Sequence, residues 1–290
     1  MDSSLSVRNK RSSAARTEDG ERRATRRPPA RRHGWRLTAA ATPLLVLLTL
    51  PLLALGLRMD FSTLWRNLSS PVVMQALTLS LTTGSIATFS VVVLGTPLAY
   101  LLARRSFRGR VVVDTLVDLP MVLPPAVAGV GLLLVFGRRG LLGPALDVMG
   151  IQIVFTPIAV ILAQIFVSAP FFVTAAAAGF AEVDQELEHA AALDGATPWG
   201  VFRNVTAALA WPALVGGAVM TWARALGEFG ATIIFAGNFP GRTQTMPLAI
   251  YLGFERDLEI AVTLAFILVV VSFLVLVVVK WLLRQRFVVQ

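Results

Sequence analysis

Cysteine is absent from this sequence of 290 residues, and histidine occurs only as His33 and His189. Without thiols the chain can form no disulfide, no thiolate nucleophile and no cysteine-ligated metal site. His33 lies in a basic terminal stretch, so a histidine metal site or a Ser-His-Asp arrangement would rest on His189 alone. We therefore expect neither a metal site nor catalytic chemistry in this chain.

Lysine is equally scarce, with Lys10 and Lys280 as its only occurrences. Neither lies in a glycine-rich loop followed by serine or threonine, which is the arrangement that cradles nucleotide phosphates. We expect no cofactor in this chain. If ATP drives its activity, another subunit binds the ATP.

Charged residues are also few, at 15% of the chain, whereas hydrophobic residues make up 56% and the mean hydropathy is +0.71. A soluble domain carries about 25% charged residues, so this composition is that of a membrane protein. Apolar runs near the ~20 residues that cross a bilayer as a helix occur six times, which predicts an all-α membrane protein with six transmembrane helices. These runs are residues 37–57, 71–103, 111–136, 151–180, 209–235 and 259–283.

Residues 1–36 hold eleven basic and four acidic residues and few apolar ones, a composition typical of disorder. A basic stretch beside a membrane span more often sets topology or touches anionic lipid than binds nucleic acid, so we expect a bilayer and no nucleic acid as its partner. The run that follows could be a cleaved signal peptide. The charged stretch before it is long, however, and no small-x-small cleavage site follows Leu57, so we interpret it as a retained helix.

Basic residues cluster again at 104–110 and at 280–286, and such clusters mark cytoplasmic segments of membrane proteins. Together with the basic tail they predict a multi-pass protein with both termini in the cytoplasm. We divide the chain into a cytoplasmic tail, a first helix with an external connection, a transmembrane domain of five helices and a cytoplasmic C-terminus. These parts are residues 1–36, 37–70, 71–283 and 284–290.

The third apolar run contains Pro120, Pro124 and Pro125 at membrane depth. Proline removes a backbone donor and clashes with the preceding turn, so a regular helix cannot pass through this run intact. Broken helices often line transport paths, and we therefore regard Pro124 and Pro125 as candidates for a translocation path or gate. The alternative is a kink that serves only packing.

Arg224 and Glu228 lie four residues apart in the fifth run. On one helical face they can pair, which lowers the cost of carrying either charge into the membrane. We interpret them as a structural or gating pair at the path. The alternative is that Arg224 attracts an anion.

A long polar stretch, residues 181–208, interrupts the apolar sequence between the fourth and fifth runs. Val183 and Leu187 recur at helical spacing among acidic residues, Gly195 can end this helix, and Thr197 can cap a second helix that begins at Pro198. A helix, a bend and a second helix form a unit that can plug into a partner. The alternative is an acidic surface loop without a partner.

Within this stretch, His189-Ala190-Ala191 followed by Gly195 resembles the cytoplasmic loop of permease subunits of ATP-binding-cassette (ABC) importers, which reads Glu-Ala-Ala, three residues, Gly. His189 stands where that family has glutamate, with Glu188 one place earlier, and Ala207 and Ala208 replace a later Leu-Pro. The resemblance implies that this loop couples the chain to an ATPase. The expected coupling residues are Glu188, His189, Ala190, Ala191, Gly195 and Pro198.

Three stretches together resemble the permease subunit of bacterial molybdate ABC importers, across about residues 71–283. They read LPMVLPPAVAGVGLLLVFGRRGLLG, HAAALDGATPWGVFRNVT and ARALGEFGATIIFAGNFPGRTQTMPLAIY. The resemblance implies a type I ABC importer permease fold in the bacterial cytoplasmic membrane, and molybdate or tungstate as cargo. It also implies a second copy of the chain, two cytoplasmic ATP-binding subunits that hold ATP and Mg, and an external oxyanion-binding protein. Sulfate or thiosulfate permeases are similar, though less closely.

Two other classes of function remain open from the residues. One is a membrane scaffold that recruits cytoplasmic proteins through the acidic loop, and the other is an intramembrane enzyme. The proline-broken third run favours a transporter over a scaffold. An enzyme lacks plausible catalytic groups, since Arg224 and Glu228 can neutralise each other.

Overall fold

The computed structural model describes residues 34–287 and the side chains of residues 39–281. Every regular element in residues 34–287 is a helix, which confirms the predicted all-α class. Five helices there are long and apolar enough to cross a membrane, and a sixth span results if one sharply bent pair is counted as one. The predicted disorder of the basic tail concerns residues that lie almost entirely outside this described range.

The chain divides into two units, the first ending at Ala54 and the second beginning at Leu55. The described part of the first unit is helix α2 (Gly34–Leu57), which passes just beyond the boundary. Its residues Ala39–Leu57 have a mean hydropathy of 2.2. A helix therefore occupies the first predicted span, although it contains Pro43 and Pro51.

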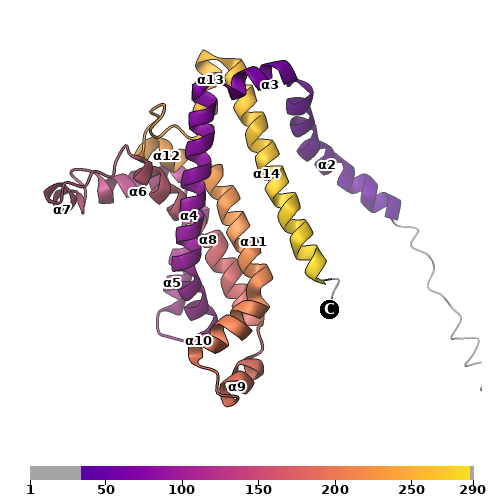
Figure 1. The fold of residues 1–290 in the computed structure, drawn as a ribbon, viewed down its shortest axis with the longest axis vertical. Coiled ribbons are helices and arrows are strands. Elements are labelled where there is room, and N and C mark those ends of the chain that lie inside the picture. Colours follow the sequence, from indigo (N-terminus) through magenta and orange to yellow (C-terminus); the bar gives the residue numbers. More distant parts are fainter. Residues whose placement is uncertain (1–33, 288–290) are drawn as a thin grey trace, which may run out of the picture. The chain divides into compact units, whose positions relative to one another are not determined.

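Three long helices of the second unit, α4, α8 and α11, pack against one another, and α14 packs against α13 and α11 (Figure 1). The helices of this unit are α3 (Phe61–Leu68), α4 (Pro71–Arg104), α5 (Arg110–Val122), α6 (Pro125–Phe136), α7 (Gly143–Val148), α8 (Pro157–Glu182), α9 (Gln185–Leu193), α10 (Pro198–Val201), the π-helical turn η1 (Phe202–Thr206), α11 (Ala207–Leu226), α12 (Gly230–Phe235), α13 (Met246–Arg256) and α14 (Leu258–Phe287).

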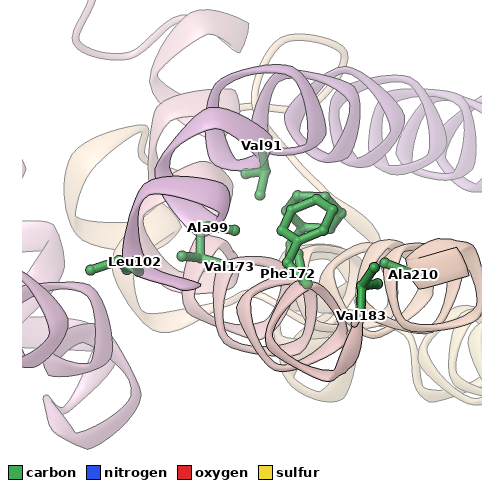
Figure 2. Close-up of a cluster of buried hydrophobic side chains, with 9 residues drawn as sticks. Val91, Ala99, Leu102, Phe172, Val173, Val183 and Ala210 are labelled. Carbon is green, nitrogen blue, oxygen red and sulfur yellow. The ribbon is translucent and has the colours of Figure 1, made fainter. Parts of the chain in front are cut away.

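Small residues let these long helices approach closely. Ala99 of α4, Ala210 of α11 and Phe172 of α8 are buried in one apolar cluster (Figure 2). A Cβ atom on Gly179 would lie 2.4 Å from the Cβ atom of Ala213, so α8 and α11 touch where only glycine fits. Close backbone packing of this kind replaces the hydrophobic driving force that is absent between helices in lipid.

The third predicted span is two helices rather than one kinked helix. The axes of α5 and α6 differ in direction by 117° across the break at Leu123 and Pro124. With 13 and 12 residues and about 1.5 Å of rise per residue, each helix is shorter than the ~30 Å hydrocarbon core. Pro124 holds extended backbone and Pro125 starts α6, whereas Pro120 lies inside α5 without ending it. The predicted break in this run is confirmed, and it lies at the later two prolines; with a bend of 117° the pair is either a broken span or a re-entrant loop.

The fifth predicted span, residues 209–235, is misplaced. A continuous helical segment runs from Pro198 to Leu226, so the second helix of the polar stretch is the first part of this span. It ends at Leu226 because Gly227 caps it, and α12 is a separate short helix. The prediction extended the span to residue 235 because residues 230–235 are also apolar.

Three connections and one helix start also differ from expectation. The fourth helix, α8, begins at Pro157 after the Thr156 N-cap, rather than at residue 151. The segments expected to be simple external connections contain α3, α7 and α13. Their residues are too few or too polar to read as spans, yet α3 has Asp60 as an N-cap that accepts a hydrogen bond from the Ser62 N–H.

The predicted topology can be tested by thiol labelling, because the native sequence has no cysteine. Ser106, in the loop between α4 and α5, and Arg139, between α6 and α7, both have exposed side chains. In intact cells we expect an impermeant thiol reagent to label Arg139→Cys and to leave Ser106→Cys unreacted until the membrane is permeabilised. Labelling of Ser106→Cys in intact cells would show that the orientation is reversed.

Candidate coupling element and translocation gate

The first helix of the polar stretch has a defined start and end. The Asp184 carboxylate accepts a hydrogen bond from the Glu186 N–H at 2.9 Å and caps α9. At the other end, the Ala196 N–H donates to the Ala191 carbonyl at 3.0 Å and Gly195 has a φ of +90°. This pattern is the Schellman motif, in which the left-handed residue is usually glycine. The predicted helix end at Gly195 therefore occurs.

The second helix begins as predicted. The Thr197 hydroxyl accepts a hydrogen bond from the Gly200 N–H at 3.2 Å, and Pro198 occupies the first helical position. The chain then continues through η1 into α11. We call residues 183–206, from Val183 to Thr206, the coupling element.

Large apolar side chains of the coupling element are exposed. Leu187 is 50% exposed, Leu193 89% and Trp199 67%. His189, Ala190, Gly195 and Pro198 are exposed beside them, and Ala191 is partly buried. Apolar groups gathered on one compact unit mark an interaction surface. Leu193 and Trp199 were not among the coupling residues expected from the sequence. Helical spacing does not indicate whether an apolar residue beside a bend is exposed.

Glu188 is directed into the protein, unlike its neighbours on α9. Its Oε1 atom accepts hydrogen bonds from Arg104 Nη2 at 2.8 Å and from the Thr206 hydroxyl at 2.6 Å. The Arg104 side chain is 8% exposed and that of Glu188 13%. Arg104 also donates to the Val183 carbonyl at 2.9 Å. Sequence analysis counted Arg104 only as part of a basic cluster that sets topology.

Arg224 and Glu228 form an ion pair, with Arg224 Nη1 and Glu228 Oε2 2.8 Å apart. Glu228 lies beyond the end of α11, so the pair spans the Gly227 cap instead of lying on one helical face. The other oxygen, Oε1, accepts a hydrogen bond from the Ala231 N–H at 2.8 Å. The Glu228 side chain is 1% exposed and that of Arg224 28%. Both carboxylate oxygens of a buried charge are therefore occupied.

The break between α5 and α6 packs against the residues that follow the Arg224–Glu228 pair. A Cβ atom on Gly230 would lie 2.8 Å from the Cβ atom of Pro125, and one on Gly129 would lie 2.8 Å from the Ala231 carbonyl oxygen. The structure thus brings Pro125 and the segment after Glu228 together, as candidates for one gate. The candidate coupling residues form a second group, and the segment from Pro198 to Leu226 connects the two.

The fold defines the class of protein. The structure is similar to the crystal structure of a bacterial ABC transporter involved in the import of the acidic polysaccharide alginate, with a TM-score of 0.65 at 18% sequence identity, covering 87% of this chain and 96% of that one. At this identity the similarity concerns the fold, which is that of type I ABC importer permeases, as predicted.

Sequence comparison identifies the family. Residues 95–287 match the family described as binding-protein-dependent transport system inner membrane component, and the chain belongs to this family. The molybdenum transport system permease protein ModB of Mycobacterium tuberculosis is 44% identical over 233 residues, which cover 80% of this chain and 88% of ModB. The probable sulfate transport system permease protein cysT of Chlorokybus atmophyticus is 36% identical over 225 residues, covering 77% and 78%.

Mutation of the ion pair tests its role. Arg224→Ala leaves the buried Glu228 carboxylate unpaired, and we expect it to lower the free energy of unfolding by about 2 kcal/mol. This loss is smaller than that for a fully buried pair, because Arg224 is 28% exposed. The combination with Glu228→Gln removes the unpaired charge and keeps an oxygen that can accept from the Ala231 N–H. It should restore the thermal unfolding midpoint in detergent more fully than the combination with Glu228→Ala. Normal stability of Arg224→Ala together with lost oxyanion uptake would instead identify Arg224 as a contact of the cargo.

Proposed function

We propose that this chain is the membrane permease subunit of an ATP-driven importer that carries molybdate, or the similar ion tungstate, across the bacterial cytoplasmic membrane. The observation that carries the proposal is the 44% identity to ModB over 88% of the length of that protein. The fold of the described residues and the family membership support the permease role independently of the cargo.

Sulfate is the alternative cargo, because the chain is 36% identical to a probable sulfate permease. Both cargoes are doubly charged tetrahedral oxyanions, so a site that binds one by charge and shape alone binds the other. The higher identity to ModB favours molybdate.

The proposal assigns ATP and Mg to two cytoplasmic ATP-binding subunits, since no nucleotide loop can be written on this sequence. Those subunits dock on the coupling element, whose exposed Leu187, Leu193 and Trp199 supply apolar contacts. A second copy of the chain completes the membrane part, and an external binding protein delivers the oxyanion. Both termini lie in the cytoplasm.

In this proposal the oxyanion passes between the two copies, near the start of α6 and the inner face of α11. A permease must release what it accepts, so binding here is weak and uses hydroxyls and backbone donors. The Arg224–Glu228 pair acts as a structural or gating element, because Glu228 is 1% exposed and neutralises most of the field of Arg224. Pro124 and Pro125 shape the gate by separating α5 from α6.

Growth under limitation tests the cargo. In a host that lacks its own molybdate and sulfate importers, the intact transporter should restore growth at limiting molybdate and leave growth at limiting sulfate unchanged. Direct uptake of each oxyanion, with the other as competitor, gives the quantitative measure. Rescue at limiting sulfate alone would show that the chain is a sulfate permease.

Substitution at the helix end tests the docking surface. Gly195 has a φ of +90°, so Gly195→Val strains the backbone by about 1–2 kcal/mol and shifts the bend between α9 and α10. We expect less ATPase subunit to co-purify with this variant. Gly109→Val is the matched control, since Gly109 has a φ of +87° and is exposed, but lies outside the coupling element. If Gly195→Val and the native chain retain equal amounts of the ATPase, Gly195 does not belong to the docking surface.

A further inference from the structure

A polar cluster joins three elements that are far apart in the sequence. Arg104 lies in the last turn of α4, Glu188 lies in α9, and Thr206 is the last residue of η1. One carboxylate oxygen, Glu188 Oε1, accepts from both of the other side chains. Thr206 is fully buried, and the two charged side chains are 8% and 13% exposed. Charge-assisted hydrogen bonds shielded from water are the strong ones, so this cluster fixes relative positions.

The cluster matters because α9 itself contributes no buried residue, although Val183 just before it is buried among the long helices. The main packing partners of α9 are η1 and α10, which belong to the same coupling element. Burial of its own apolar residues therefore does not attach α9 to the long helices. Within the described residues, the side-chain hydrogen bond that ties α9 to α4 is the one made by Glu188.

Helix α4 in turn reaches the segments near the candidate gate. It runs unbroken for 34 residues. Near its other end, the Ser80 hydroxyl accepts a hydrogen bond from the Met246 N–H at 2.7 Å, at the start of α13. Ser85 accepts one from the Trp222 indole N–H of α11 at 3.3 Å. A shift of α4 along or about its axis therefore changes contacts with α13 and with the end of α11 that carries Arg224.

We propose that the cluster of Arg104, Glu188 and Thr206 is the link through which movement of the docked coupling element drives α4, and that Arg104 is a positioning residue for transport. This inference rests on the proposed function. Glu188 then acts toward the interior of its own chain, while the ATPase meets Leu187, Leu193 and Trp199. Loss of the link disconnects ATP hydrolysis from transport and leaves docking intact.

The matched variants are Arg104→Gln and Glu188→Gln, with Arg105→Gln and Glu186→Gln as controls. The controls remove the same charges from neighbouring positions whose side chains are exposed. In the complete transporter reconstituted in vesicles, the two link variants should lower molybdate uptake per ATP hydrolysed by about fivefold or more, with ATPase retention unchanged. The controls should transport as the native chain does. A fall in uptake that only parallels a loss of bound ATPase would overturn the link.

Rescue distinguishes a specific pair from a general disturbance. The exchange Arg104→Glu with Glu188→Arg places opposite charges at the same two positions, so it should recover part of the uptake per ATP that either single change loses. Loss in the exchange variant equal to the sum of the two single losses contradicts a direct link.

A second readout does not depend on the cargo. Arg242 is exposed in the segment between α12 and α13, so Arg242→Cys can be labelled in a chain without native cysteine. We expect its labelling rate to change when the complex is trapped with ATP and vanadate, and Arg104→Gln to abolish this change. If the change occurs but vesicles take up no molybdate, the link stands and the proposed cargo fails. If Arg104→Gln keeps both the change and the uptake, the link is wrong and the proposed function stands.

Discussion

The requirement that every backbone polar group be satisfied where no water reaches governs this structure. It is met by hydrogen bonds within helices over the long spans, and by side chains where helices end at membrane depth. Gln164 of α8 donates to the Ala225 carbonyl at the end of α11, and Glu228 accepts from the Ala231 N–H at the start of α12. Gln164 and Glu228 thus serve the backbone at the end of one helix and the start of the next.

The long helices could be predicted because hydrophobicity reports burial in lipid directly, and the bend at Gly195 and Pro198 because capping acts within a few residues. The end of α11 could not, since Ala231 to Phe235 is as apolar as a span and only residues 227–229 divide its helix from α11. The short helices between spans were missed for a related reason. They lie among turn residues and are set by tertiary contacts.

In the candidate site, too, contacts between residues close in sequence could be predicted and contacts between distant residues could not. Arg224 and Glu228 are close in sequence, so their pairing could be anticipated, although the bond from the Ala231 N–H in the first turn of α12 to Glu228 could not. Arg104 and Glu188 are separated by 84 positions, and no local pattern indicates that they meet. Arg104 belongs to a basic cluster whose charge was explained by membrane topology, so nothing in the sequence indicated that its side chain is buried. Long-range polar contacts become visible only when the helices are in place.

The helical segment from Pro198 to Leu226 joins the candidate coupling element at one end to the candidate gate at the other, on one rod of 29 residues. At about 1.5 Å per residue the rod is about 44 Å long, so a tilt of about 5° around its Pro198 end displaces the Leu226 end by about 4 Å. The π-helical turn lies near the Pro198 end, where Arg203 and Asn204 are exposed and Thr206 is buried. A slight rotation of such a rod at one side of the membrane would therefore produce a displacement of atomic dimensions at the other.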